Sequence, residues 1–415
     1  MKRVFPLPAW FHLAARTSIL HAGIAMAAVY VYWVAASATH NLWGLALEPL
    51  DVFDDVSLYL SYGSRIVEGQ LPHRNFLVEY PLLACLWFWL PSLITRSFLP
   101  YAATFACLML LANGAIVMLV ARQVTLESGI EEAGRRCGWY TICFAVLCPL
   151  TIARFDTAPA AITLASAILW GSGRVHAAGA GFALGTLTKL FPALGAVPWM
   201  IAGPGRKRGI LAFCCTAALG IAAWALLTGE GVVASIRYHT ERGIEIESVY
   251  AGSLWLLSKA TGGAAAQSVD HGARGLLAAG AGAAALAAPW LQAALVLGTI
   301  LAGARMAPLN WTRFSPAILL AFVVSGKVLS PQYLIWLLPY FALMDERLGI
   351  RCRRGFLVAC VLTSSVYPWT FAGLMRFNTL PWLLLNLRNA VLVWLLIILV
   401  AGIRSTAAPL TNREP

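Results

Sequence analysis

The stretch from Glu48 to Pro81 reads EPLDVFDDVSLYLSYGSRIVEGQLPHRNFLVEYP, and it decides how the rest of the chain is interpreted. After Glu48 it holds five further acidic residues in an otherwise mostly apolar protein: Asp51, Asp54, Asp55, Glu68 and Glu79. It follows the first long apolar run and is too polar to cross a bilayer. We therefore expect it to lie at a membrane surface and to carry functional side chains.

The composition of the chain is that of a membrane protein. Of its 415 residues, 60% are hydrophobic and 12% are charged, and the mean hydropathy is +0.75. Soluble domains are about 45–50% apolar and about 25% charged. We therefore expect an all-α, polytopic integral membrane protein. No cleaved signal peptide is expected, because the basic segment 1–16 leads into an apolar run that is longer than the apolar core of a signal.

The apolar runs predict about twelve membrane spans, with a range of 10 to 13, because one span needs about 20 mainly apolar residues. The spans are expected near residues 18–39, 99–121, 139–154, 157–172, 177–189, 191–203, 210–228, 280–302, 313–329, 332–345, 353–371 and 382–403. Residues 81–95 are a further apolar run with prolines at 81 and 91. That run either spans the membrane, re-enters it or lies in the interface.

We expect a single membrane domain over residues 1–404. Its first extracytoplasmic loop is residues 40–80, and a later outer loop is residues 229–253. Residues 405–415 are expected to form a short disordered cytoplasmic tail.

The distribution of charge orients these spans. With a cytoplasmic N-terminus, the predicted inner segments hold 18 of the 30 Lys and Arg residues but only 6 of the 18 Asp and Glu residues. An excess of Lys and Arg marks cytoplasmic loops. Both termini are therefore expected in the cytoplasm. The net charge of +12 is explained by this topology, and we predict no nucleic-acid partner.

Three further polar segments share the outer face with the opening stretch: 154–156, 237–248 and 327–332. If residues 55–66 are helical, Asp55 and Tyr59 share one face of the helix. A carboxylate shielded beside a bilayer can act as a general base. The alternative is a solvated loop in which Asp54 or Asp55 caps a helix.

Several charged residues also have an ordinary structural interpretation. Lys189 and Lys327 lie near helix ends, where they can simply reach the interface. Arg154 and Asp156 can form a structural ion pair. The nine cysteines lie mostly within apolar runs, so no disulfide framework and no metal cage are predicted. The acidic cluster leaves a divalent metal possible without indicating one, and no nucleotide-binding motif is present.

Short motifs run through the chain in a recognisable order. The opening stretch contains DVSLY (55–59), GQLPHRNF (69–76) and VEYPLL (78–83). Later come RFDTAP (154–159), TKLFP (188–192), RYH with RG and EIES (237–248), GKVLSPQY (326–333) and RN (388–389). This series resembles the polyprenyl-phosphate-dependent glycosyltransferases of the GT-C superfamily, most closely family 87. His73 replaces the usual Tyr and Leu82 replaces a Pro of that pattern.

The resemblance implies an inverting transfer of a sugar, with mannose the commonest, from a polyprenyl-phosphate carrier to a lipid or glycan acceptor. It places the site on the outer face of a bacterial plasma membrane and implies no cofactor. A first-loop Asp takes the acceptor proton; Asp55 matches, with Asp54 and Asp51 as alternatives. The candidates for binding the donor phosphate are Arg154, Lys189, Arg237, His239, Arg242 and Lys327. The candidates for binding the substrates are Tyr59, Glu79, Tyr80, Asp156, Glu245, Glu247 and Gln332.

Two other classes of function remain open at this point. A secondary transporter also has about twelve spans and buried charges, although it often carries an internal two-fold repeat, which is not found here. A lipid flippase or a lipid-binding scaffold of the same fold would need no catalytic carboxylate.

Overall fold

The fold is known from a computed structural model that describes residues 7–38, 51–229, 231–270, 272–305, 309–344 and 346–406. The first half contains the helices α1 (Ala9–Ala38), α2 (Asp51–Val67), α3 (Ala84–Ser92), α4 (Phe98–Ser128), α5 (Ile130–Ala153), α6 (Thr157–Gly171), α7 (Val175–Thr188), α8 (Phe191–Ala202) and α9 (Arg206–Thr228). The second half contains α10 (Gly231–Glu241), α11 (Val249–Thr261), β1 (Ala265–Asp270), β2 (Ala273–Ala278), α12 (Ala281–Gly303), α13 (Trp311–Ser325), α14 (Leu334–Leu343), α15 (Glu346–Ser364), α16 (Phe371–Met375) and α17 (Thr379–Thr406). Short 3-10 and π turns cover Pro331–Tyr333 and Ser365–Thr370.

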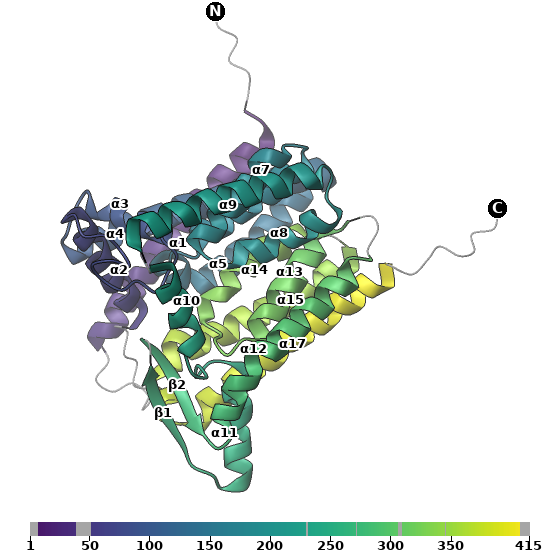
Figure 1. Cartoon of the computed structure of the whole chain (residues 1–415). Coiled ribbons are helices and arrows are strands. Elements are labelled where there is room, and N and C mark those ends of the chain that lie inside the picture. The colour runs from purple at the N-terminus through teal and green to yellow at the C-terminus, as the bar shows by residue number, and fades with distance from the viewer. Residues whose placement is uncertain are drawn as a thin grey trace, which may run out of the picture.

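Every predicted apolar run from residue 18 onward coincides with a helix, and the chain is almost wholly α-helical (Figure 1). Within the described residues, seven helices are long and apolar enough to cross a membrane: α1, α4, α5, α9, α12, α15 with its continuation to Met375, and α17. This finding supports a multi-pass membrane protein. It does not support the predicted number of twelve, because the other five predicted spans are helices of 10–15 residues.

The five short helices α6, α7, α8, α13 and α14 are mostly buried in protein. They contribute to the buried cores, and every residue of α14 is buried. Helix breaks adjoin them at three places: Arg154–Asp156 lies between α5 and α6, Lys189–Leu190 lies between α7 and α8, and Gly326–Ser330 follows α13. Irregular backbone is tolerated at membrane depth only where protein buries it or where it lines a cavity. The breaks therefore indicate where a cavity lies.

The first outer loop differs from its prediction. Residues 39–50 lie outside the described residues, but Asp51–Val67 is a regular helix, α2, which includes the expected helix at 55–66. The apolar run 81–95 forms only the nine-residue helix α3, so it is not among the candidate spans. The predicted inner loop 122–138 is also helical on both sides of Gly129, because α4 and α5 continue past their apolar segments.

The sequence did not predict the structure between α9 and α12. The predicted outer loop 229–253 contains α10 and the start of α11, and a two-stranded hairpin follows them. Strands β1 and β2 pair antiparallel, with Val269 opposite Arg274. The hairpin is extended by a third segment, because Leu276 N donates to Ile244 O and Ile246 N donates to Arg274 O, both at 3.0 Å. In Figure 1 the hairpin lies beside α11, at one end of the helix assembly.

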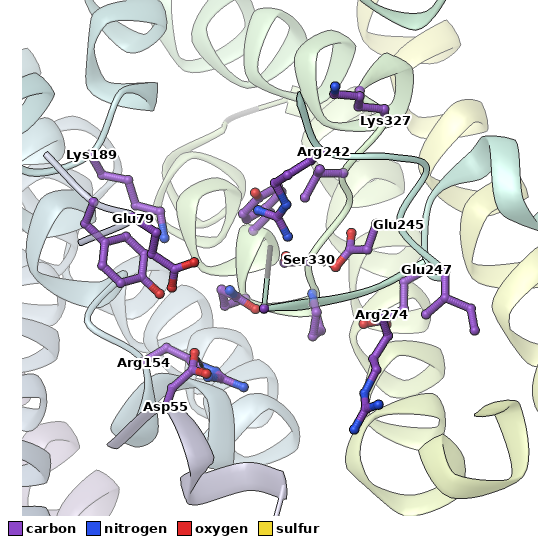
Figure 2. Close-up of a pocket in the computed structure, with 18 of the residues that line it drawn as sticks. Asp55, Glu79, Arg154, Lys189, Arg242, Glu245, Glu247, Arg274, Lys327 and Ser330 are labelled. Atoms are coloured by element: carbon purple, nitrogen blue, oxygen red, sulfur yellow. Dashed lines mark hydrogen bonds and ion pairs between the residues drawn. The ribbon is translucent and has the colours of Figure 1, made fainter. Parts of the chain in front are cut away.

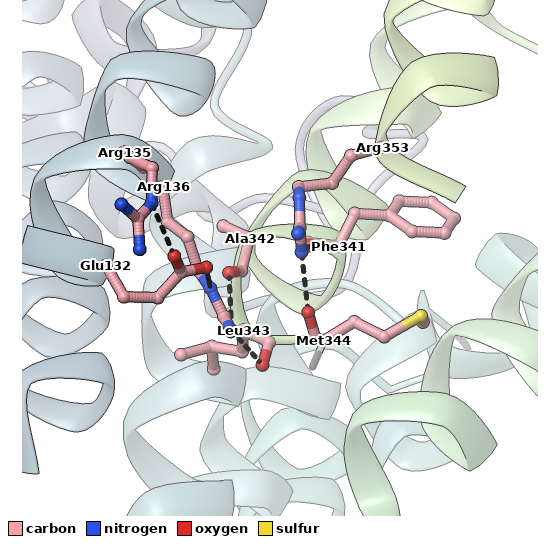
Figure 3. A network of polar contacts seen from close by, with 8 residues as sticks. All are labelled: Glu132, Arg135, Arg136, Phe341, Ala342, Leu343, Met344 and Arg353. Carbon is pink, nitrogen blue, oxygen red and sulfur yellow. Dashed lines mark hydrogen bonds and ion pairs between the residues drawn. The ribbon is translucent and has the colours of Figure 1, made fainter. Parts of the chain in front are cut away.

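Two arginines, one from α5 and one from α15, hold the C-terminal end of α14 (Figure 3). Arg136 of α5 donates to Leu343 O at 2.9 Å, and Arg353 of α15 donates to Met344 O at 2.6 Å. The last carbonyls of a helix have no partner within the helix. Arg136 and Arg353 therefore satisfy buried groups that a ten-residue helix cannot satisfy itself.

We expect Arg136→Gln to lower stability by about 1–3 kcal/mol, because buried carbonyls would lose a charged donor. Arg135→Gln is the matched control: both arginines pair with Glu132 at 2.7 Å, but the side chain of Arg135 is 70% exposed and that of Arg136 is 3% exposed. Arg135→Gln should change stability by less than about 0.5 kcal/mol. Thermal unfolding of the purified variants in detergent measures both, and equal losses would contradict this account.

Candidate functional site

A cavity of about 570 Å³ lies where the helix breaks meet. Its walls come from the start of α2, the ends of α5 and α7, the loop before α11, the hairpin and the segment after α13. Figure 2 shows carboxylates and cations from these distant parts of the chain facing one another. The predicted site residues that line it are Asp54, Asp55, Glu79, Tyr80, Arg154, Lys189, Arg242, Glu245, Glu247, Lys327 and Gln332.

The ion pair between Asp55 and Arg154 forms one side of the cavity. Arg154 ends α5 in an extended conformation, and its Nη2 donates to the hydroxyl of Tyr367 at 2.9 Å. Its Nε has no hydrogen-bond partner among the described residues although it is buried. The expected pairing of Asp55 with Tyr59 is present as a long contact of 3.5 Å from the hydroxyl to Oδ2. The guanidinium thus has donor capacity left for a ligand.

Lys189 lies on the same side of the cavity as Arg154, in a wall of aromatic rings (Figure 2). Its Nζ is 2.7 Å from Asp156 Oδ1, and the same oxygen accepts from Trp336 Nε1 at 2.7 Å. The ammonium is within 6 Å of the ring centroids of Phe155, Trp336, Tyr80 and Tyr333. Cation–π contact and the ion pair hold this charge at the cavity wall. Asp156 is itself buried behind Lys189, so it positions the lysine instead of facing a ligand.

The loop 242–248 forms the opposite side, and Glu245 is its central residue. Its carboxylate accepts from Leu329 N and, at 3.3 Å, from Ser330 Oγ, while its own N–H donates to Lys327 O at 2.9 Å. Burial raises the pKa of Glu245, and Arg242 opposes that shift. Glu245 therefore joins two walls of the cavity through the backbone, which is a different role from the substrate contact predicted for it.

Glu247 is the most deeply buried carboxyl of the cavity. It lies 3.7 Å from Arg388 of α17, and Arg388 also donates to the main-chain oxygen of Glu247 at 2.6 Å. Burial raises its pKa from 4.5 to about 8; the charges of Arg388 and Arg154 oppose the shift, and Glu245 adds to it. Glu247 is therefore able to hold a proton near neutral pH.

The raised pKa of Glu247 predicts a pH dependence of stability. Because the folded protein holds this proton more tightly, its contribution is fully present below pH 4.5 and is lost as the pH rises through about 8. We expect the unfolding temperature of the wild type to fall between pH 6 and 9 and that of Glu247→Gln to fall less. Glu68→Gln, an exposed control, should keep the wild-type slope. Identical slopes for all three would contradict the assignment.

The remaining predicted residues lie elsewhere. Tyr59 is buried behind the cavity and stacks on Phe88, with centroids 4.3 Å apart. Arg237 is exposed, pairs with Glu241 at 3.8 Å and does not line the cavity. Asp51 begins α2 and His239 lies in α10, but the side chains of both lie outside the described residues.

Residues that line the cavity and were not predicted from the sequence include Gln292, Trp336, Tyr367 and Arg274. The first three lie inside or beside apolar runs, where polar and aromatic side chains are ordinarily interpreted as anchors at the membrane interface. Arg274 belongs to an Ala- and Gly-rich segment, and its neighbours in the sequence give no indication of a site. No sequence signal singled these four out.

Among the described residues, no group of three or more His, Cys, Asp or Glu side chains is placed to hold a metal ion. No protein-family model matches the chain, and no curated protein sequence matches it.

Proposed function

We propose that the chain is an integral membrane glycosyltransferase of GT-C type that transfers a sugar, most simply mannose, from a polyprenyl-phosphate carrier to a lipid or glycan acceptor. The observation that carries the proposal is the cavity, which is lined by Asp55 of α2, by Arg154 after the candidate span α5 and by Lys189 after α7. A reaction that deprotonates a hydroxyl and releases a lipid phosphate needs both a base and fixed cations.

In this proposal Asp55 accepts the proton of the acceptor hydroxyl as that oxygen attacks the anomeric carbon of the sugar. The bond between the anomeric carbon and the phosphate oxygen breaks, and the electron pair leaves with the polyprenyl phosphate. Inversion at the anomeric carbon follows from this single displacement. Arg154 and Lys189 stabilise the departing phosphate, and no cofactor enters the reaction.

The sidedness of the cavity supports an extracytoplasmic site. The end of the molecule opposite to the cavity is the one where Arg136 and Arg353 contact the end of α14. Helices α5 and α7 run from that end toward the cavity, and α9 and α15 begin at that end. The basic residues there include Arg135, Arg136, Arg174, Arg206, Lys207, Arg208, Arg351, Arg353 and Arg354. By the positive-inside rule this end lies in the cytoplasm. The cavity then faces the other side of the plasma membrane.

A secondary transporter is the second candidate, because broken helices that end at a charged cavity also form transporter sites. The two candidates differ in what they do to a substrate. A transporter moves it unchanged across a sealed membrane, whereas the proposed enzyme forms a new glycosidic bond.

The test is sugar transfer by the purified full-length protein with membrane lipids as acceptors. We expect transfer from radiolabelled polyprenyl-phosphate-mannose and none from GDP-mannose. A panel of other polyprenyl-phosphate sugars, including arabinofuranose, identifies the donor. Absence of transfer from the whole panel, together with solute flux in proteoliposomes, would overturn the proposal in favour of a transporter.

A further inference from the structure

The hairpin brings to the cavity a cation that the reaction above leaves without a role. Arg274 lines the cavity, and its guanidinium has no ion-pair partner among the described residues. Arg154, in contrast, is paired with Asp55, and Lys189 is paired with Asp156. Figure 2 shows Arg274 across the cavity from Arg154 and Asp55. The cavity therefore presents cations on two separate sides.

The fold fixes the position of Arg274. Its main-chain oxygen accepts from Ile246 N at 3.0 Å, in the same loop that carries Glu245 and Glu247. Residues two apart in a strand lie on one face, and on this face Leu276 is buried in a cluster with Ile244, Ile246, Trp255 and Trp382. The hairpin is thus anchored in the core by Leu276, and Arg274 extends from the same face over the cavity.

The depth of Arg274 in the membrane follows from what comes next in the chain. Strand β2 ends at Ala278, and the candidate span α12 begins at Ala281. Along α12, Leu286 and Trp290 have exposed fractions of 77% and 79%, as expected for a span whose surface faces lipid. Arg274 precedes the first residue of this span by only seven residues. Arg274 therefore lies at the level of the lipid headgroups.

We propose that Arg274 binds the phosphate of an anionic phospholipid headgroup and that this lipid is the acceptor of the reaction. The acceptor role rests on the proposed glycosyl transfer, whereas the anion binding does not. The planar guanidinium donates two parallel hydrogen bonds to phosphate oxygens. The donor phosphate is held at Arg154 and Lys189, so each of the two anions has its own cations on its own side of the cavity.

Binding of short-chain lipids to the purified full-length protein in maltoside detergent tests this inference, with phosphatidylglycerol compared with phosphatidylcholine of the same chain length. We expect the wild type to bind phosphatidylglycerol about tenfold more tightly, which corresponds to ~1.4 kcal/mol. Arg274→Gln should lose this preference, and Arg274→Lys should keep part of it. Arg174→Gln, at the opposite end of the molecule, should keep all of it.

Equal binding of the two lipids by the wild type, or an unchanged preference in Arg274→Gln, would overturn the inference. Inorganic phosphate that binds as tightly as phosphatidylglycerol would identify a free-phosphate site and overturn the headgroup assignment. The measurement needs no sugar donor. A protein that prefers phosphatidylglycerol through Arg274 but transfers no sugar therefore overturns the glycosyl transfer and leaves the lipid site standing.

Discussion

Asp55→Asn is expected to reduce sugar transfer by about 10²- to 10⁴-fold, the range that general base catalysis contributes. The side chain keeps its size and can still accept a hydrogen bond from Tyr59, but it can no longer take a proton. The substitution also removes the charge that faces Arg154. The loss should therefore appear in kcat more than in KM. Initial rates at varied acceptor concentration measure both constants.

The chain offers a matched control for this variant. Glu68 comes directly after α2, the helix that carries Asp55. It pairs with Arg96 at 3.4 Å, but both side chains are about half exposed and neither lines the cavity. Glu68→Gln should keep wild-type activity. If Asp55→Asn transfers sugar at the wild-type rate while it elutes as a monodisperse protein, Asp55 is not the base, and Asp54 becomes the leading candidate.

Arg154→Gln is expected to lower kcat by about 10²- to 10³-fold, the cost of removing one donor that stabilises transition-state charge. Arg154 is buried, fixed by Tyr367 and paired with Asp55. A neutral side chain at this position removes one of the two cations that we assign to the departing phosphate. Arg154→Lys should recover part of the rate, because it restores the charge without the fork of donors.

Arg96→Gln is the control for this substitution, since it breaks the exposed pair with Glu68 instead of the cavity pair. It should leave kcat unchanged. The double variant Asp55→Asn/Arg154→Gln should lose less than the sum of the two single losses in free energy, because residues in one ion pair are coupled. Fully additive losses, or equal effects of Arg96→Gln and Arg154→Gln, would argue against a catalytic pair.

The positions of the helices could be predicted from the sequence, because apolar runs between polar breaks are a strong signal of membrane helices. The lengths of the helices could not be predicted in the same way. Helix α5 begins nine residues before its predicted span, because a charged amphipathic turn continues a helix beyond the apolar segment. Helices α8 and α14 were interpreted as spans, yet they are 12 and 10 residues long. Apolar composition does not distinguish a helix surrounded by lipid from one surrounded by protein.

The candidate site was predictable in part for a related reason. Charged residues such as Arg154, Lys189 and Glu247 stand out in an apolar chain, and helix breaks bring them to one cavity. The hairpin that carries Arg274 gave no such signal, since Ala and Gly are poor strand formers. The strands are stabilised by backbone hydrogen bonds to the segment around Ile244 and Ile246. Because that segment is distant in the sequence, the pairing depends on tertiary structure and cannot be predicted from the local sequence.

The most direct test of the central claim is a structure of the full-length protein bound to a polyprenyl phosphate, determined by cryo-electron microscopy in a lipid nanodisc. We expect phosphate density within hydrogen-bonding distance of Arg154 and Lys189, with the polyprenyl chain leaving the cavity toward the bilayer. Phosphate bound at the basic segment 206–208, with the cavity around Asp55 empty, would contradict it.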